Sequence, residues 1–269
     1  MNRILFEKDE IRDGIVTFGD VRAEHVLGVL HGAVGQILKT GEVDGPIGTS
    51  EILSIPSSLI PHPSSLSVTV RCTHVQESLR PWVDLILAPP RPRVMKRLLP
   101  QLATMGVGRI FLVGAKKVEK DFWGATLLKP ENYRPLLIDG LMQAGTSILP
   151  TLETRRNFRK FVKEELDTLW PAAKRIVAHP YGAKDARQET PDARLSSPLS
   201  RPSGLSSQVL GPPPRLLLAV GPEGGWTDEE VALLEEHGFT RHSLGSRILR
   251  TDTATIALLA QLMQVYDQE

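Results

Sequence analysis

The feature that most constrains the fold is an alternation, beginning after Pro81, of short apolar runs with segments of helical period. The apolar runs cover residues 82–87, 109–113, 175–178 and 215–220, and between them apolar residues recur every three or four positions. Strands that alternate with helices build a mostly parallel sheet with helices on its faces. Residues 79–269 are therefore predicted to form an α/β domain.

The chain before Pro81 has a different pattern. Short β-prone runs at residues 14–18, 35–39, 51–55 and 66–70 are separated by Gly, Pro, Asp and Ser turns. One helical segment, residues 20–30, places Val21, His25 and Val29 on a shared face. This pattern predicts a small β-barrel over residues 1–78.

Residues 184–214 are rich in Pro, Ser, Gly and Arg and poor in large apolar side chains. Such a composition does not offset the entropy lost on ordering, so we expect a mobile insertion that is not part of the fold. Its arginines leave open a contact with RNA.

Composition limits the class of protein. The net charge of the 269 residues is only +1, so a polyanionic partner would have to meet a local basic patch. The single cysteine, Cys72, forms no intramolecular disulfide and offers no metal-ligand cluster. No stretch approaches the roughly 18 apolar residues of a membrane helix. We expect a cytoplasmic protein with no metal and no membrane segment.

A glycine-rich loop follows the last apolar run. Gly-Pro-Glu-Gly-Gly-Trp occupies residues 221–226, and Thr227 and Glu230 have the spacing of a capping box that begins a helix. That helix should run to His237, with Gly238 as its stop. Ligands bind at this edge of open α/β sheets, where glycines let a ligand approach the backbone. The glycines alone would also suit an ordinary tight turn.

A second loop of the same kind lies near the C-terminus. The segment Leu-Gly-Ser-Arg-Ile-Leu-Arg-Thr-Asp-Thr-Ala, residues 244–254, connects an expected strand at 240–244 to an expected helix at 252–266. Two such loops at one sheet edge would form a pocket. With both motifs present in this order, the chain resembles the RsmE family of SPOUT methyltransferases, most strongly from residue 215 onward.

The resemblance implies much that the pattern of residues does not. Family members methylate N3 of a uridine in small-subunit (16S) ribosomal RNA and use S-adenosylmethionine as cofactor. Their α/β domain contains a deep trefoil knot and forms a homodimer, and their N-terminal region is a PUA-like barrel that helps to hold RNA. The expected partners are therefore ribosomal RNA or the small ribosomal subunit, and a second copy of the chain.

The resemblance also implies which residues bind the cofactor. Backbone N–H and C=O groups of the two loops would bond its polar atoms, while Leu244, Ile248 and Leu249 would contact the adenine; Ile248 and Leu249 would equally suit a plain hydrophobic core. The full predicted set is His179, Pro180, Val220, Gly221, Pro222, Glu223, Gly224, Leu244, Gly245, Ile248, Leu249, Thr253 and Ala254.

Two arginines are candidates for catalysis. Methylating uridine N3 requires loss of its proton and stabilisation of the charge that spreads to the flanking carbonyl oxygens, which fixed cations do well. Arg250 is the favoured residue and Arg247 the second, although either could form a structural salt bridge. No general base is evident; Glu223, Asp252 and water are the candidates.

Residues 91–120 carry eight basic side chains against the single acid Glu119. Cations that neutralise phosphates supply sequence-independent affinity for RNA. A solvated helix face is the alternative, and it is the preferred interpretation of the mixed-charge stretch 155–167. With Arg3 from the first domain, the predicted RNA-binding set is Arg3, Arg91, Arg93, Lys96, Arg97, Lys116 and Lys117.

The sequence departs from its family in two helices. Residues 101–106 lack the acid, and residues 142–146 lack both the acid and the arginine, that family members carry there. These losses weaken the inference that this chain has the same target nucleotide as its family more than they weaken the inference that it binds the same cofactor. Two alternatives stay open: an RNA-binding protein that no longer methylates, and a phosphate-binding α/β enzyme, although the lysine that a phosphate loop places after its glycines is missing.

Overall fold

The computed structural model describes residues 2–55, 66–180 and 216–266. The predicted insertion at 184–214 lies outside these residues. The chain divides into two compact units, one of Met1–Arg80 with Glu131–Leu149 and one of Pro81–Pro130 with Pro150–Glu269. Residues 131–149, which we assigned to the second domain, group with the first unit. The predicted boundary between two domains, after residue 78, stays a prediction.

The second unit contains a six-stranded sheet in the order β11-β9-β10-β6-β7-β8, and every pair in it is parallel. The predicted α/β class with a parallel sheet is confirmed. Its strands are β6 (Val83–Leu87), β7 (Val107–Val113), β8 (Thr151–Arg155), β9 (Lys174–Ala178), β10 (Leu216–Val220) and β11 (Thr240–His242). All five residues of β6 and of β10 are buried, as expected for strands covered on both faces.

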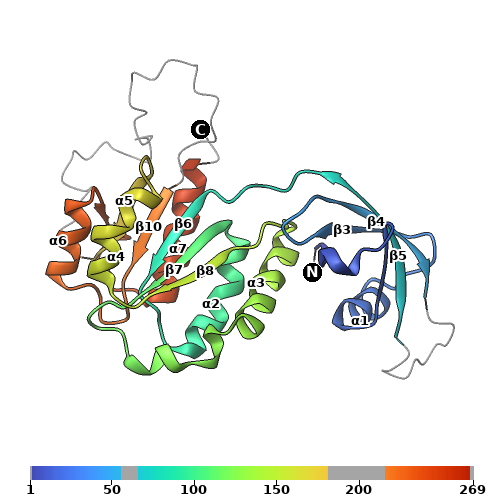
Figure 1. Cartoon of the computed structure of the whole chain (residues 1–269), viewed down its shortest axis with the longest axis horizontal. Coiled ribbons are helices and arrows are strands. Elements are labelled where there is room, and N and C mark those ends of the chain that lie inside the picture. The colour runs from blue at the N-terminus through green and yellow to red at the C-terminus, as the bar shows by residue number, and fades with distance from the viewer. Residues whose placement is uncertain (1, 56–65, 181–215, 267–269) are drawn as a thin grey trace, which may run out of the picture. The chain divides into compact units, whose positions relative to one another are not determined.

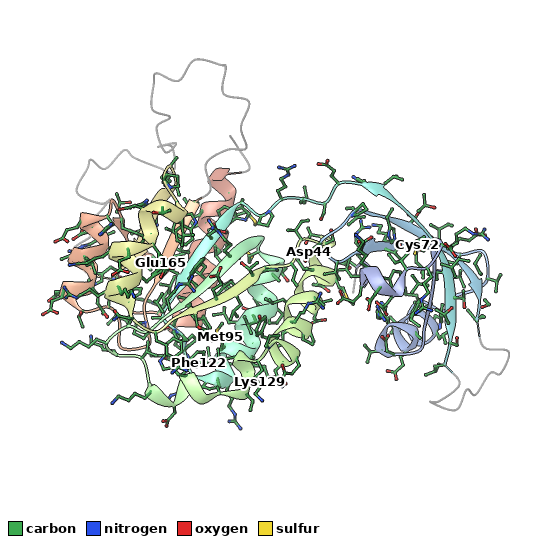
Figure 2. The ribbon with its side chains drawn as sticks, in the orientation of Figure 1. Asp44, Cys72, Met95, Phe122, Lys129 and Glu165 are labelled. Carbon is green, nitrogen blue, oxygen red and sulfur yellow. The ribbon has the colours of Figure 1, made fainter. Side chains whose placement is uncertain are left out.

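Helices cover both faces of this sheet (Figure 1). One face carries α4 (Phe158–Glu164), α5 (Leu166–Leu169) and α6 (Asp228–Glu236), and the other carries α2 (Pro92–Thr104) and α7 (Thr251–Tyr266). Phe111, Phe161 and Trp170 pack together under α4 and α5. On α2 the side chain of Met95, labelled in Figure 2, is fully buried. Short 3-10 helices η3 (Lys120–Gly124) and η4 (Thr126–Leu128) follow β7.

One charged side chain lies inside this core. Asp84 on β6 is fully buried and accepts hydrogen bonds from the Arg109 backbone N–H (2.9 Å), Arg109 Nε (2.8 Å) and Trp170 Nε1 (2.7 Å). The Arg109 guanidinium lies over the Trp170 ring, 4.5 Å from its centroid. A buried carboxylate is tolerated because each of these bonds replaces one to water. The cluster links strand β6, strand β7 and the residue that follows α5.

The first unit contains a five-stranded sheet in the order β1-β3-β4-β5-β2. Its elements are β1 (Ile4–Phe6), η1 (Lys8–Glu10), β2 (Ile15–Phe18), α1 (Val21–Gly28), β3 (Ile37–Glu42), β4 (Ile47–Ser54), β5 (Val68–Gln76) and α3 (Pro130–Ala144). The strand pairs are antiparallel except β1 with β3. Among the described residues β1 and β2 are the outer strands, so closure into a barrel stays a prediction.

Helix α3 is held against the first unit by its own hydrogen bonds. The Arg134 guanidinium bonds both carboxylate oxygens of Glu7. The backbone N–H groups of Asn2 and Arg3 both donate to the Met142 carbonyl at 3.0 Å. The stretch 142–146, where the chain lacks its family's charged residues, therefore contacts the N-terminus of the chain through its backbone.

Candidate functional site

A pocket of about 600 Å³ lies at the carboxyl ends of β9 and β10 in the second unit. Three segments wall it: the loop after β10, the segment between β11 and α7, and the first turns of α7. Parallel sheets bind ligands at this edge, and the volume falls within the range of about 300–1,000 Å³ for small-molecule sites. The two loops found in the sequence therefore meet, as their positions predicted.

The loop after β10 is built from its own hydrogen bonds. Gly225, at φ +70°, donates its N–H to the Pro222 carbonyl at 2.8 Å, a turn that favours glycine. Thr227 and Glu230 form the predicted capping box: the Thr227 Oγ1 accepts the Glu230 N–H, and Glu230 Oε2 accepts the Thr227 N–H at 2.8 Å. The start of α6 and the glycine loop are thus fixed together.

Residue 221 has no room for a side chain, so the loop requires a glycine there. A Cβ added there would come within 3.0 Å of the Trp226 backbone nitrogen and 3.1 Å of its indole ring. Trp226 is itself buried and stacks on Phe158, with ring centroids 5.1 Å apart. The absence of a side chain at residue 221 therefore lets the loop fold back onto the core.

The segment between β11 and α7 is attached at its start. The His179 N–H donates to the His242 carbonyl at 3.0 Å, which joins the end of β9 to the end of β11. Ser243 Oγ bonds both the carbonyl and the N–H of Gly245. From there the side chains are open to solvent, with Ile248 72% exposed and Leu249 37% exposed. These two residues do not form a plain hydrophobic core in the single chain.

Thr251 connects the two loops. It is the first residue of α7, is 5% exposed, and donates its hydroxyl to the Gly221 carbonyl at 3.4 Å. Its own carbonyl accepts the hydroxyl of buried Thr255 at 2.7 Å. Thr251 belongs to the second motif, but it was not among the predicted site residues. A hydroxyl residue at the first position of a helix, after an exposed loop, is the signal that could have found it.

The structure brings most of the predicted cofactor-binding residues to this pocket. Gly245 and Thr253 do not line it. Those that do are His179, Pro180, Val220, Gly221, Pro222, Glu223, Gly224, Leu244, Ile248, Leu249 and Ala254.

The two candidate catalytic arginines differ in position. Arg247 lines the pocket, whereas Arg250 does not; the Arg250 side chain is 72% exposed, with its Nε 3.8 Å from Asp252 Oδ1. Of the candidate bases, Glu223 lies on the pocket wall, where its Oε1 accepts the Arg91 N–H at 3.2 Å. Asp252 does not line the pocket, and its other carboxylate oxygen lies 3.8 Å from Arg97.

Two further cations line the pocket. Lys117, predicted to bind RNA, donates its Nζ to the Gly224 carbonyl at 2.8 Å and so lies across the glycine loop. Arg241, which the sequence did not single out, bonds both carboxylate oxygens of Glu235, at 2.7 and 2.8 Å. These bonds hold the pKa of Glu235 below its usual value. Sequence distance concealed the role of Lys117 in this pocket, since 107 positions separate it from Gly224.

The remaining predicted RNA-binding residues fall into two groups. Arg91, Arg93, Lys96 and Arg97 are exposed at the start of α2, and Lys116 is exposed after β7. Arg3 is different: its guanidinium donates to the carbonyls of Gly145, Thr40 and Gly48 at 2.7–2.9 Å. Burial lowers the pKa of Arg3. Arg3 therefore serves the packing of the first unit, and its contact with RNA stays a prediction.

The described residues were compared with two further kinds of feature, a metal-ligand group and a membrane-spanning helix. They contain no group of three or more His, Cys, Asp or Glu side chains that could hold a metal ion. No described helix is both long enough and apolar enough to cross a membrane.

Known proteins resemble this chain in sequence and in fold. A Treponema pallidum protein named ribosomal RNA small subunit methyltransferase E is 29% identical over 98% of this chain and 91% of its own. A Borreliella burgdorferi protein of the same name, numbered 1, is 26% identical over 96% and 95%. The structure of the Neisseria gonorrhoeae methyltransferase E bound to S-adenosylmethionine has a TM-score of 0.66 and 20% identity, covering 98% of both chains. That likeness shows a common fold.

A family model described as an RNA methyltransferase domain matches residues 77–263. The match spans both loops of the pocket and all six strands of the parallel sheet that positions them. The family model matches more than half of the chain, and the relatives above are named ribosomal RNA small subunit methyltransferase E. The chain therefore belongs to the RsmE family of RNA methyltransferases.

Proposed function

We propose that the protein is an S-adenosylmethionine-dependent methyltransferase that modifies N3 of a uridine in 16S ribosomal RNA. The observation that carries the proposal is the pocket formed by the two motif loops in a chain of this family. Relatives that align with nearly the whole chain are named for methylation of small-subunit ribosomal RNA. The same family membership makes ribosomal RNA the substrate class.

The residues of the pocket suit the proposed cofactor. The carbonyls of Gly221, Pro222 and Gly224 already accept hydrogen bonds within the chain, so the polar backbone groups that the loop can offer a ligand are the N–H groups of its exposed residues 223 and 224. Val220, Leu244 and Leu258 supply apolar surface for a purine ring. Trp226 also lines the pocket, and its buried Nε1 has no hydrogen-bond partner among the described residues. A ligand with both an apolar ring and many polar atoms matches such a lining.

When bound, S-adenosylmethionine supplies an electrophilic methyl group. The chain's part is to hold the uridine beside it and to favour the anionic form of the base. Arg250, exposed and loosely paired with Asp252, is free to approach a substrate carbonyl oxygen, and Arg247 lies closer to the pocket. A fixed cation there would stabilise the charge left when N3 loses its proton. Glu223 is the acidic candidate for that proton.

Several finer features belong to the same proposal. The exposed apolar side chains of Ile248 and Leu249 support a homodimer in which a second copy covers this segment. The mixed sheet of the first unit supports a PUA-like barrel, and the strand order of the second supports a trefoil knot. A cytoplasmic location agrees with a ribosomal substrate.

The test is calorimetric titration of the purified protein with S-adenosylmethionine and S-adenosylhomocysteine, followed by mapping of modified uridines in 16S RNA. We expect saturable binding of both ligands, and its loss in Gly224→Trp. Residue 224 is exposed, and the nearest atom to a Cβ there is Cδ of the flexible Lys117 side chain, 2.9 Å away, so this variant should fold. Folded wild-type protein that binds neither ligand would instead favour an RNA-binding protein without activity.

A further inference from the structure

A second hollow, of about 410 Å³, lies at the carboxyl ends of β7 and β8, beside the starts of α4 and α6. We call it the basic hollow, for Lys116, Arg156 and Arg159 on its wall. It shares no lining residue with the pocket described above. The two cavities flank the start of α6, since Thr227 lines the hollow and its neighbour Asp228 lines the pocket.

The cations of the hollow lack tight acidic partners among the described residues. No carboxylate there lies within 4 Å of the charged groups of Lys116 or Arg156, and Arg159 is 3.9 Å from Glu229, with both side chains more than half exposed. The Arg156 guanidinium donates a hydrogen bond of 3.3 Å to the Trp123 carbonyl and lies over the Trp123 ring, 5.7 Å from its centroid. It is thus held in place without being neutralised.

The acids of the hollow are only partly available to oppose these cations. Glu230 is occupied by backbone donors, because Oε1 accepts the Lys116 N–H at 2.7 Å and Oε2 accepts the Thr227 N–H at 2.8 Å. Glu229 is 73% exposed and therefore well solvated. Phe158 and Leu233, both nearly buried, form an apolar floor. An anionic group that carries some apolar surface fits this combination.

We propose that the basic hollow binds the backbone of the substrate RNA, at a phosphate near the target uridine. The inference rests on the proposed function, which makes the ligand an RNA strand. Lys116 and Lys117 are consecutive, with Cα atoms about 3.8 Å apart, yet one faces the hollow and the other faces the pocket. A strand whose target base enters the pocket can therefore reach the hollow by crossing only the start of α6.

This assignment revises one interpretation of the sequence. Residues 155–167 looked like a solvated helix with mixed charges, and part of the stretch is so: Arg155 pairs with Glu153 and Glu165, and Lys160 lies 3.8 Å from Glu164. Arg156 and Arg159 differ, since both face the hollow. The RNA-facing surface therefore extends from β7 across the end of β8.

The test compares two double variants of the full chain. Arg156→Ala/Arg159→Ala removes two cations of the hollow. The control Lys160→Ala/Lys163→Ala removes two exposed cations of α4, the helix that carries Arg159 and begins two residues after Arg156, and neither lysine lines the hollow. The probe is in vitro transcribed 16S ribosomal RNA, with affinity measured over a range of salt concentrations. Thermal unfolding verifies that both variants fold.

We expect the hollow variant to bind at least tenfold more weakly and to lower the slope of log affinity against log salt by about 1, the loss expected for one phosphate contact. The control should keep the wild-type slope. Equal affinities and slopes for the two variants would overturn the proposal. Calorimetry with S-adenosylmethionine separates the two hypotheses: the hollow variant should bind it normally, whereas failure of the wild type to bind it would count against the proposed function alone.

Discussion

The two loops of the cofactor pocket are built in opposite ways. The loop at residues 221–226 has buried Gly221, Pro222 and Trp226, an internal turn and a capping box. The segment at residues 245–250 is exposed along its whole length. It is anchored by the Ser243 hydroxyl at one end and by Thr251 at the other. The glycine loop is therefore preformed in the free chain, whereas the 245–250 segment makes few contacts with the rest of the protein.

The difference has an energetic consequence. A preformed wall loses little conformational entropy when a ligand binds, whereas an exposed segment must be ordered, at about 0.5–1.5 kcal/mol for each immobilised side chain. The glycine loop should therefore govern whether the cofactor binds at all. The exposed segment should change cofactor affinity less and should mainly govern what happens after binding, since ligand, RNA or a second copy of the chain must cover it.

The largest expected effect comes from breaking the preformed wall. In Gly221→Val the new side chain would push against the Trp226 backbone, and such overpacking costs about 1–3 kcal/mol of stability. We expect affinity for S-adenosylmethionine, measured by calorimetry, to fall by more than about tenfold. Gly124→Val is the control, because a Cβ there meets nothing within 4 Å. Wild-type affinity in folded Gly221→Val would mean that this wall is not preformed.

The same contrast explains how much of the site the sequence could predict. The capping box at Thr227 and Glu230 and the stop at Gly238, whose φ is +80°, are local signals, and the structure confirms both. Strands β6, β7, β9 and β10 lie where apolar runs predicted them. Local patterns succeed there because the residues that determine each element are neighbours in sequence.

Contacts between distant residues could not be predicted. Lys117 reaches Gly224, and Arg156 comes beside Lys116, only because parallel strands place their carboxyl ends at one edge. Strands β1 and β8 were also missed; β1 has three residues, and β8 has mostly polar side chains and only partial burial. Arg3 looked like an RNA ligand, since nothing in its sequence neighbourhood indicated the three carbonyls that it bonds.

A smaller effect is expected in the exposed segment, and in catalysis rather than binding. Arg250→Ala should lower kcat for methylation of 16S RNA at least about tenfold, or about 1.4 kcal/mol, because a cation that stabilises the uridine anion is lost. Cofactor affinity and thermal stability should change little, since the side chain is 72% exposed. Arg80→Ala is the matched control, being 76% exposed with an equally loose partner at 4.0 Å. Full activity in Arg250→Ala would remove this residue from the mechanism.

The smallest effects test the comparison most directly, by removing one hydroxyl that anchors each wall. Thr227→Ala deletes an N-cap and should cost about 1 kcal/mol in urea unfolding. Ser243→Ala deletes bonds within an exposed turn and should cost under about 0.5 kcal/mol. Its effect should instead be seen in cofactor affinity, because a looser segment has more entropy to lose on binding. Ser243→Ala could instead destabilise the free protein as much as Thr227→Ala does. The segment at residues 245–250 would then be as firmly held in the free protein as the glycine loop, and the two walls would not differ in how much they must be ordered when a ligand binds.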